Sequence, residues 1–379
     1  MVSRDFQRTM PGASTHFRKA PSLWSYTHLD AWLLLLVLML CGYGLFILYS
    51  ASGQDIGDVK RQAIRMGAGL FMLVFLAQVK PRTLMSLTPW LYLFVLALLI
   101  AVMFFGVSAK GAQRWLPLPG FRFQPSELMK LVLPMAIAAY LVREQLPPSL
   151  KQIVIAVVIM AIPAALIMKQ PDLGTSLLIA SSGVFVLLLS GLYWRYVIAA
   201  LALISASLPV LWAFMKGYQQ QRVLTFLNPE SDPLGAGWNI IQSKTAIGSG
   251  GLSGKGWLQG TQSQLNFLPE SHTDFVIAVV GEELGFYGIA FLLLLYLLII
   301  FRGMILAMRA HDRFARLLAG SIILTFFVYV LVNIGMVTGL LPVVGVPLPM
   351  ISYGGTSIVT LMSGFGILMA VGTHAQRPT

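Results

Sequence analysis

The chain has 379 residues, of which 57% are hydrophobic and only 11% are charged. Soluble proteins carry about 25% charged residues, so this composition excludes an ordinary soluble fold and favours a bundle of membrane helices. The formal net charge of +12 could suggest a nucleic-acid partner, but its distribution indicates a membrane instead, and the single cysteine, Cys41, excludes a disulfide within the chain.

Long apolar runs predict an all-α, polytopic membrane protein with about ten transmembrane helices. Ala31–Tyr49, Leu84–Phe105 and Tyr196–Met215 are uncharged, and each is long enough to cross a bilayer at about 1.5 Å per residue. A membrane barrel is not expected, because the sequence lacks the alternation typical of its strands. The predicted spans are 31–50, 62–79, 84–106, 125–142, 152–169, 172–191, 195–215, 274–301, 316–340 and 351–372.

The basic residues predict the orientation of these spans. Segments on the side of both termini carry most of the surplus of Lys and Arg over Asp and Glu, and the positive-inside rule places that side in the cytoplasm. Residues 1–30 and 373–379 are therefore expected to be cytoplasmic tails. No small-residue cleavage site follows the first span, so we expect that span to be retained rather than removed as a signal peptide.

Two connections are long, and both are expected on the outer side. Residues 107–124 join spans three and four. Residues 216–273 form a large extracytoplasmic loop between spans seven and eight, which separates the span groups 31–215 and 274–372. This loop is rich in Trp, Leu, Ile and Phe, so we expect it to fold back against the membrane face rather than to be disordered.

Two spans begin with a proline beside an acidic residue. Gln124–Glu127 opens the fourth span, and Gln170–Asp172 opens the sixth. Proline at the first helical position and an acid near the positive helix end are ordinary features of a helix start, so a purely capping role is one interpretation. Glu127 and Lys130 are three residues apart and share a helix face, where we expect them to pair because an isolated charge is costly at that depth.

Asp274 leads into the eighth span, where water meets hydrocarbon. Partial desolvation makes a carboxylate a better base, which suits general base catalysis, although a helix cap is the alternative. Glu282 and Glu283 follow within the same span and point to different faces, so at most one can share the surroundings of Asp274. A polar contact that holds helices together is the other interpretation of these two residues.

Small and polar residues, Ser352–Ser357, open the tenth span, and close helix packing alone could explain them. In the predicted topology, spans four, six, eight and ten all begin on the outer side. Their positive ends converge there near Arg114, Lys244 and Lys255. This arrangement predicts a receptor for an anionic group, such as a lipid-linked phosphate.

Taken in order, these motifs resemble the SEDS family of shape, elongation, division and sporulation proteins across nearly all ten spans. Gln113 and Leu173 favour its elongation (RodA-like) branch over the division branch. The matching stretches are Gly111–Trp115, Phe123–Lys130, Gln170–Thr175, Ile240–Lys244, Ala246–Gly251, Phe267–Glu270, His272–Phe275 and Ser352–Ser357.

The resemblance implies a peptidoglycan glycosyltransferase of the bacterial cytoplasmic (inner) membrane, with its active site outside. Such proteins polymerise lipid II into glycan strands by an inverting transfer in which undecaprenyl pyrophosphate leaves the growing chain. The implied partners are a class B penicillin-binding protein, which is a monofunctional transpeptidase, the lipid II and nascent lipid-linked glycan, and other membrane proteins of the elongation complex. No nucleic-acid partner is expected.

The resemblance also assigns roles to residues. Asp274 matches the family's essential aspartate, as general base or as ligand of a divalent cation, Mg or Mn. Arg114, Glu127 and Lys130 match family positions that support the site. The remaining candidates for substrate binding or support are Asp172, Ser243, Lys244 and Ser352, which lie in the matching stretches, and Glu282, which lies further along the eighth span.

Two other classes of function stay open. A lipid II flippase or a transporter of lipid-linked sugars would also need charges within the membrane, but it needs access from both faces, and the acids here gather on one side. A membrane scaffold that docks a transpeptidase has no use for Asp274.

Overall fold

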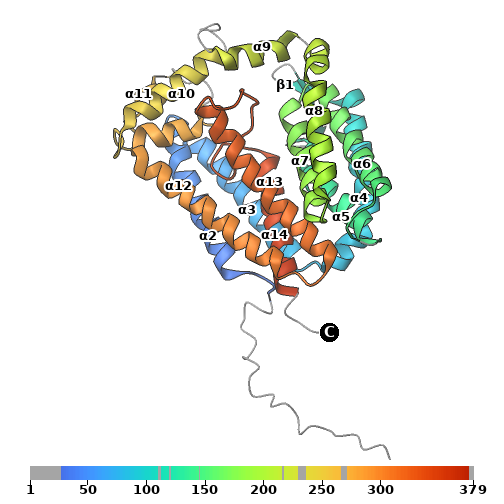
Figure 1. Ribbon diagram of the computed structural model, residues 1–379. Helices are drawn as coiled ribbons and strands as arrows, with labels where there is room; N and C mark the ends of the chain where they lie inside the picture. Colours follow the sequence, from blue (N-terminus) through green and yellow to red (C-terminus); the bar gives the residue numbers. More distant parts are fainter. Residues whose placement is uncertain are drawn as a thin grey trace, which may run out of the picture.

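The computed structural model describes residues 27–109, 112–118, 121–144, 146–215, 217–228, 236–265 and 271–374. Each of the ten predicted spans overlaps one long helix, with ends that differ by up to seven residues. These helices run back and forth between the two ends of a bundle (Figure 1). They are α2 (Ala31–Ala51), α3 (Ile56–Ala77), α4 (Pro81–Phe105), α5 (Pro125–Val142), α6 (Leu150–Lys169), α7 (Leu173–Leu189), α8 (Trp194–Phe214), α12 (Val276–Met308), α13 (Arg313–Val337) and α14 (Thr356–His374).

The start of α2 and the end of α14 meet at one end of the bundle (Figure 1). There, the Thr373 hydroxyl donates to the His28 carbonyl at 3.3 Å, and Arg302 of α12 pairs with Asp30 through two bonds of 2.5 and 3.0 Å. The opposite end carries a small sheet and the short helices α9–α11, and we call it the loop end. Helices α5, α7, α12 and α14 all begin at the loop end.

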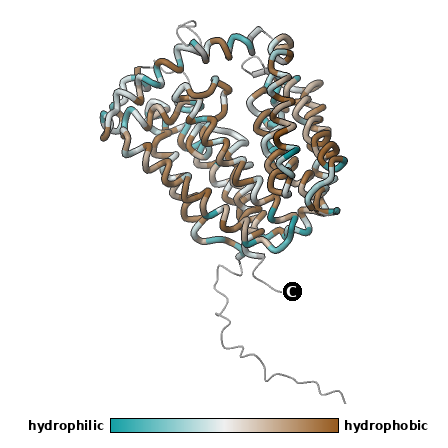
Figure 2. The backbone as a smooth tube through the Cα atoms, viewed as in Figure 1, coloured by the Kyte–Doolittle hydropathy of each residue, from teal (hydrophilic) through white to brown (hydrophobic). Residues whose placement is uncertain are grey.

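Among the described residues, seven helices are long and apolar enough to cross a membrane by length and composition: α2, α4, α5, α6, α12, α13 and α14. Helices α7 and α8 are apolar but shorter by this measure, and α3 carries charges in its first turns at Asp58, Arg61 and Arg65. Figure 2 shows hydrophobic residues along the lengths of the helices. The protein is a multi-pass membrane protein.

Helix α13 lies at the centre and joins the two main parts of the core. One apolar cluster unites α2, α3, α12 and α14, the other unites α4–α7, and α13 contributes to both. Aromatic rings join α12, α13 and α14. The ring centre of Phe326 on α13 lies 5.8 Å from that of Tyr296 on α12 and 5.1 Å from that of Phe365 on α14, both in edge-to-face contacts. A side chain on the loop-end part of α13 can therefore contact several elements at once.

Helix α12 is interrupted at Gly285, whose φ of 63° and ψ of −155° are not helical. In a continuous helix, the amides of Phe286 and Tyr287 would bond the carbonyls of Glu282 and Glu283. Here these two amides and two carbonyls instead bond backbone groups of residues 251–256. Lys255 and Gly256 donate to the two carbonyls at 3.0 Å, and the carbonyls of Gly251 and Leu252 accept from the two amides at 3.0 and 3.2 Å.

The two long connections at the loop end contain secondary structure that was not predicted from the sequence. Between α4 and α5, three strands form an antiparallel sheet: β1 (Val107–Ala109), β2 (Ala112–Leu118) and β3 (Phe121–Phe123). The segment between α8 and α12 contains α9 (Gly217–Leu227), α10 (Ala236–Gly250) and α11 (Thr261–Gln264). Helix α10 packs onto α12 and α13, so this part of the loop is folded against the helix bundle, and its contact with the membrane face stays a prediction.

Some predicted features lie outside the described residues. They are most of the N-terminal tail, most of the C-terminal tail, Gly111 of the first matching motif, and the whole of the motif Phe267–Glu270. Every residue proposed for the site itself falls within the described part of the chain.

Candidate functional site

The segment that carries Asp274 is held by its backbone at the loop end. Asp274 immediately precedes Phe275, which is the N-cap residue of α12 and makes no capping bond with its side chain. Three consecutive carbonyls before the helix each accept a hydrogen bond from α13 or from the α13–α14 segment (residues 338–355). The donors are Tyr353 N to His272 O at 2.8 Å, Ser352 Oγ to Thr273 O, and Asn333 Nδ2 to Asp274 O at 2.8 Å.

The Asp274 carboxylate lies against a glycine of the α13–α14 segment. A Cβ atom on Gly345 would be 3.4 Å from Asp274 Oδ2, and Gly345 has a φ of +74°, which favours glycine. The next residue, Val346, has its carbonyl bonded to Asn333 at 2.7 Å. The carboxylate of Asp274 therefore lies against this segment, and Asn333 links the Asp274 carbonyl to the same segment.

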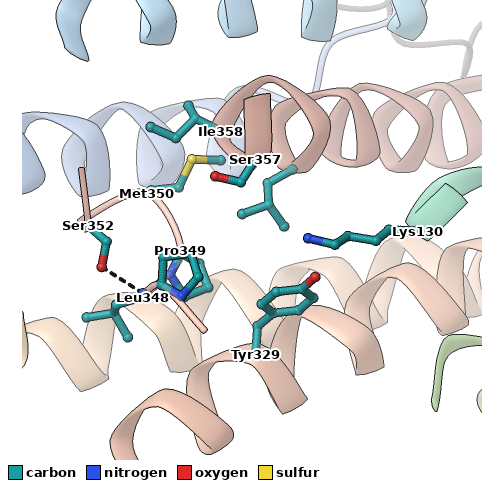
Figure 3. Close-up of a pocket in the computed structure, with 10 residues that line it drawn as sticks. Lys130, Tyr329, Leu348, Pro349, Met350, Ser352, Ser357 and Ile358 are labelled. Atoms are coloured by element: carbon teal, nitrogen blue, oxygen red, sulfur yellow. Dashed lines mark hydrogen bonds between the residues drawn. The ribbon is translucent and has the colours of Figure 1, made fainter. Parts of the chain in front are cut away.

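Glu127 and Lys130 form the pair expected from their spacing. Lys130 Nζ is 2.7 Å from Glu127 Oε1, and both side chains are almost completely buried. The Lys130 ammonium also lies 4.9 Å from the centre of the Tyr329 ring, on α13. Figure 3 shows Lys130 and Tyr329 on one side of a cavity, with Ser352 and Leu348 of the α13–α14 segment on the other. Ser352 thus connects this cavity to the Asp274 segment.

A second cavity, of about 30 Å³, adjoins the first on the other side of Lys130 and Tyr329. Its walls include Glu127 and Thr325, and buried oxygens of Glu127, Thr325 and Tyr329 have no hydrogen-bond partner within the described part of the chain. The rest of the wall is mainly apolar, but a space of this size suits a water molecule or two, for which these oxygens offer partners. It is far too small for a sugar.

Arg114 and Asp172 connect the sheet to the start of α7. Their closest atoms are 3.4 Å apart, and Arg114 on β2 also donates to the carbonyls of Gln170 and Pro171. Asp172 is the N-cap of α7 and accepts from Thr175 N at 3.2 Å. The expectation of Pro171 as the first helical residue was wrong, because the cap lies between Pro171 and the helix. Proline does begin α5, at Pro125.

Ser243, Lys244 and Glu282 connect the loop to neighbouring helices. The buried Ser243 hydroxyl lies 2.8 Å from the Val337 carbonyl, and the Lys244 side chain packs over Gly339, so both join α10 to the end of α13. Glu282 is fully buried and accepts from Lys255 Nζ at 2.7 Å and from the first amides of α11. These contacts make Glu282 an anchor for the loop, as the interpretation of a polar contact between elements predicted.

The predicted anion receptor is only partly open in this structure. Arg114 pairs with Asp172 and Lys255 pairs with Glu282, whereas Lys244 is exposed. Spacing along the sequence cannot show which cations are already neutralised, because both partner carboxylates come from other elements.

Sequence reasoning missed four residues of this region. Asn333 and Tyr329 are polar side chains inside the apolar ninth span, and that position was the available signal. Arg61 and Arg65, near the start of α3, surround Tyr353. Arg61 Nε lies 3.3 Å from the Tyr353 hydroxyl, and the Arg65 guanidinium lies 4.7 Å from its ring centre.

The described residues contain no group of three His, Cys, Asp or Glu side chains that could hold a metal ion. A magnesium ion is commonly bound by one or two carboxylates together with substrate phosphates. The donor set at Asp274 therefore fits a cation that arrives with a pyrophosphate, and not a cage built from protein side chains alone.

Comparison with known proteins identifies the family. The model of the FtsW/RodA/SpoVE family, described as cell cycle proteins, matches residues 31–377. The chain is 54% identical over 356 residues to the peptidoglycan glycosyltransferase MrdB of Escherichia coli (strain K12), covering 94% of this chain and 96% of that protein. It is 37% identical over 361 residues to the probable peptidoglycan glycosyltransferase FtsW of Geobacter metallireducens, covering 92% and 95%.

Two solved structures share the fold. One belongs to a study of "structural coordination of polymerization and crosslinking by a peptidoglycan synthase complex", with a TM-score of 0.83, 31% identity, and coverage of 92% of this chain and 99% of that chain. The other is the rod shape determining protein RodA of Thermus thermophilus, with a TM-score of 0.70, 28% identity, and coverage of 92% and 98%. The chain therefore belongs to the SEDS family, the family of FtsW, RodA and SpoVE.

Proposed function

We propose that this protein is a peptidoglycan glycosyltransferase that polymerises lipid II during cell elongation. It lies in the bacterial inner membrane with both termini in the cytoplasm and with the loop end, which carries Asp274, outside. The observation that carries the proposal is the fixed backbone at Asp274, whose carbonyl accepts from Asn333 and whose neighbour Thr273 accepts from Ser352, in a chain 54% identical to a peptidoglycan glycosyltransferase. A scaffold would not need this carboxylate.

The reaction is an inverting glycosyl transfer. The growing glycan is the donor, and its anomeric carbon is bonded to pyrophosphate. A sugar hydroxyl of incoming lipid II attacks that carbon from the opposite face, and Asp274 accepts the hydroxyl proton. The carbon–oxygen bond to the pyrophosphate breaks, and undecaprenyl pyrophosphate leaves with the bonding electrons. Pyrophosphate is a good leaving group, so the reaction needs no separate acid.

The other candidate residues support this step by positioning the elements of the loop end. Glu127 and Lys130 place a buried charge pair beside the cavity that Ser352 also lines, and Ser352 holds the Asp274 segment. Arg114 and Asp172 join the sheet to α7, Ser243 and Lys244 position α10, and Glu282 anchors the loop. We expect these residues to maintain the shape of the loop end where the lipid-linked substrates bind.

The partner proposed for this chain is a class B penicillin-binding protein, a transpeptidase that crosslinks the new strands, together with other membrane proteins of the elongation complex. The structural relative from a peptidoglycan synthase complex that coordinates polymerization and crosslinking supports this assignment. The lipid substrates are lipid II and the nascent lipid-linked glycan.

Purified protein, alone and with the transpeptidase, should convert labelled lipid II into glycan polymer that lysozyme digests. The assay separates the three classes of function. Movement of lipid II across a vesicle membrane without polymer would identify a flippase. Neither polymer nor movement, with the transpeptidase still bound, would identify a scaffold.

We further propose that a divalent cation, magnesium or manganese, takes part, with Asp274 as the protein carboxylate beside it. A cation at this place would neutralise charge on the departing pyrophosphate. Polymerisation should therefore fall at least about tenfold in excess EDTA and return when magnesium or manganese is added back. Full activity in EDTA, with the chelator shown to be in excess over all metal, would refute this part of the proposal.

A further inference from the structure

Asn333 is a fully buried polar residue near the loop end of α13. Its side-chain amide nitrogen donates to two backbone carbonyls at once, Asp274 O at 2.8 Å and Val346 O at 2.7 Å. The two acceptors belong to different elements, the segment before α12 and the α13–α14 segment. Asn333 therefore bridges three parts of the chain through one NH₂ group.

The chemistry of this position requires an uncharged group with two donor hydrogens. The NH₂ group of asparagine has two, and each is donated to a different backbone carbonyl. Aspartate has the same shape but presents acceptors to both carbonyls. Serine has a single donor on a shorter side chain, and alanine has none.

The bridge lies directly at Asp274. Val346 follows Gly345, and Gly345 is the residue against which the Asp274 carboxylate packs. By joining the Asp274 and Val346 carbonyls, Asn333 sets the distance between the backbone that carries the carboxylate and the surface beneath the carboxylate. A change of about 1 Å in such a placement is enough to cost about 10²-fold in rate.

We propose that Asn333 is a positioning residue for Asp274: its bridge between the Asp274 and Val346 carbonyls holds the carboxylate where the acceptor hydroxyl must be deprotonated. The inference rests on the proposed function of Asp274. Asn333 itself touches neither substrate nor reacting atoms.

The test measures initial rates of lipid II polymerisation by the full chain over a range of lipid II concentrations, for monodisperse protein only. Asn333→Asp and Asn333→Ala should each lower kcat at least tenfold and leave KM within about threefold, because the bridge places the base and not the lipid. Asn333→Ser keeps one donor and adds no charge, so its kcat should lie between that of these variants and that of the natural chain. If Asn333→Asp fails to fold, the kcat of Asn333→Ser still tests the inference.

Ser321→Ala is the matched control, because Ser321 is a fully buried residue of the same helix. Its hydroxyl lies 2.7 Å from the Ser182 carbonyl, about 18 Å along the helix from Asn333. This variant should lower the melting temperature without changing kcat. Normal kcat in folded Asn333 variants, an equal loss in Ser321→Ala, or a loss confined to KM would each overturn the inference.

Asp274→Asn in the same assay distinguishes a failure of the positioning role of Asn333 from a failure of the catalytic role of Asp274. If Asp274→Asn is inactive while the Asn333 variants keep a normal kcat, the positioning role fails and the proposed function survives. If Asp274→Asn polymerises normally, the catalytic assignment fails, and the positioning role fails with it.

Discussion

Replacing Asp274 by asparagine should abolish most polymerisation while leaving the protein folded. Asparagine keeps the size of the side chain and can still accept hydrogen bonds, but it cannot take a proton and binds a cation poorly. General base catalysis contributes about 10² to 10⁴, so lipid II polymerisation should fall at least 100-fold. If the residue only caps a helix, the change should cost a few tenths of a kcal/mol in stability and almost no activity.

Melting temperature and co-purification with the transpeptidase should be measured on the same samples. Glu283→Gln is a suitable control, because Glu283 is a buried carboxylate of the same helix whose Oε1 accepts from the Ser50 hydroxyl at 2.5 Å. It should reduce stability without a comparable loss of rate. A stable, partner-bound Asp274→Asn protein with near-normal polymer synthesis would remove Asp274 from the mechanism.

Replacing both members of the Glu127–Lys130 pair should restore most of the stability that a single replacement loses, but not the activity. Lys130→Met leaves the buried Glu127 charge without its partner, which typically costs about 3–5 kcal/mol. The double variant Glu127→Gln with Lys130→Met removes both charges at similar volume, so its melting temperature should recover most of that loss. Its polymerisation should stay at least about tenfold low if the charges themselves are needed to maintain the active shape of the loop end.

Polymerisation rate and melting temperature of the two single variants and the double variant together decide the role of the pair. Recovery of rate along with stability in the double variant would make the pair a structural contact only. Thr325→Val is a useful companion, because Thr325 lines the same cavity and carries no charge.

The spans could be predicted because the hydropathy of a stretch of about 20 residues depends on those residues alone. Helix α4 coincides closely with the apolar run that predicted it, and the Glu127–Lys130 contact follows from spacing on one helix face. The end of α12 was less well predicted: the helix continues to Met308, beyond the predicted limit of residue 301. Nothing in hydropathy ends a helix where it leaves the apolar region.

Contacts between distant residues could not be predicted in the same way. The pairing of Arg114 with Asp172 and of Lys255 with Glu282 depends on how the sheet and the loop fold back, which no local pattern specifies. The sheet itself was missed because two of its strands are only three residues long. The interruption at Gly285 depends on backbone partners from another segment, so the glycine alone was an insufficient signal.

The interruption of α12 also makes the loop a part of that helix. Residues 251–256 bond backbone groups on both sides of Gly285, so they bridge the break, and Glu282 reinforces this joint through Lys255. The piece from Val276 to Leu284, about 12 Å long, is therefore fixed by the loop at one end and, next to Asp274, by α13 and the α13–α14 segment at the other. The place of the carboxylate thus depends on the loop as well as on the helix that follows it.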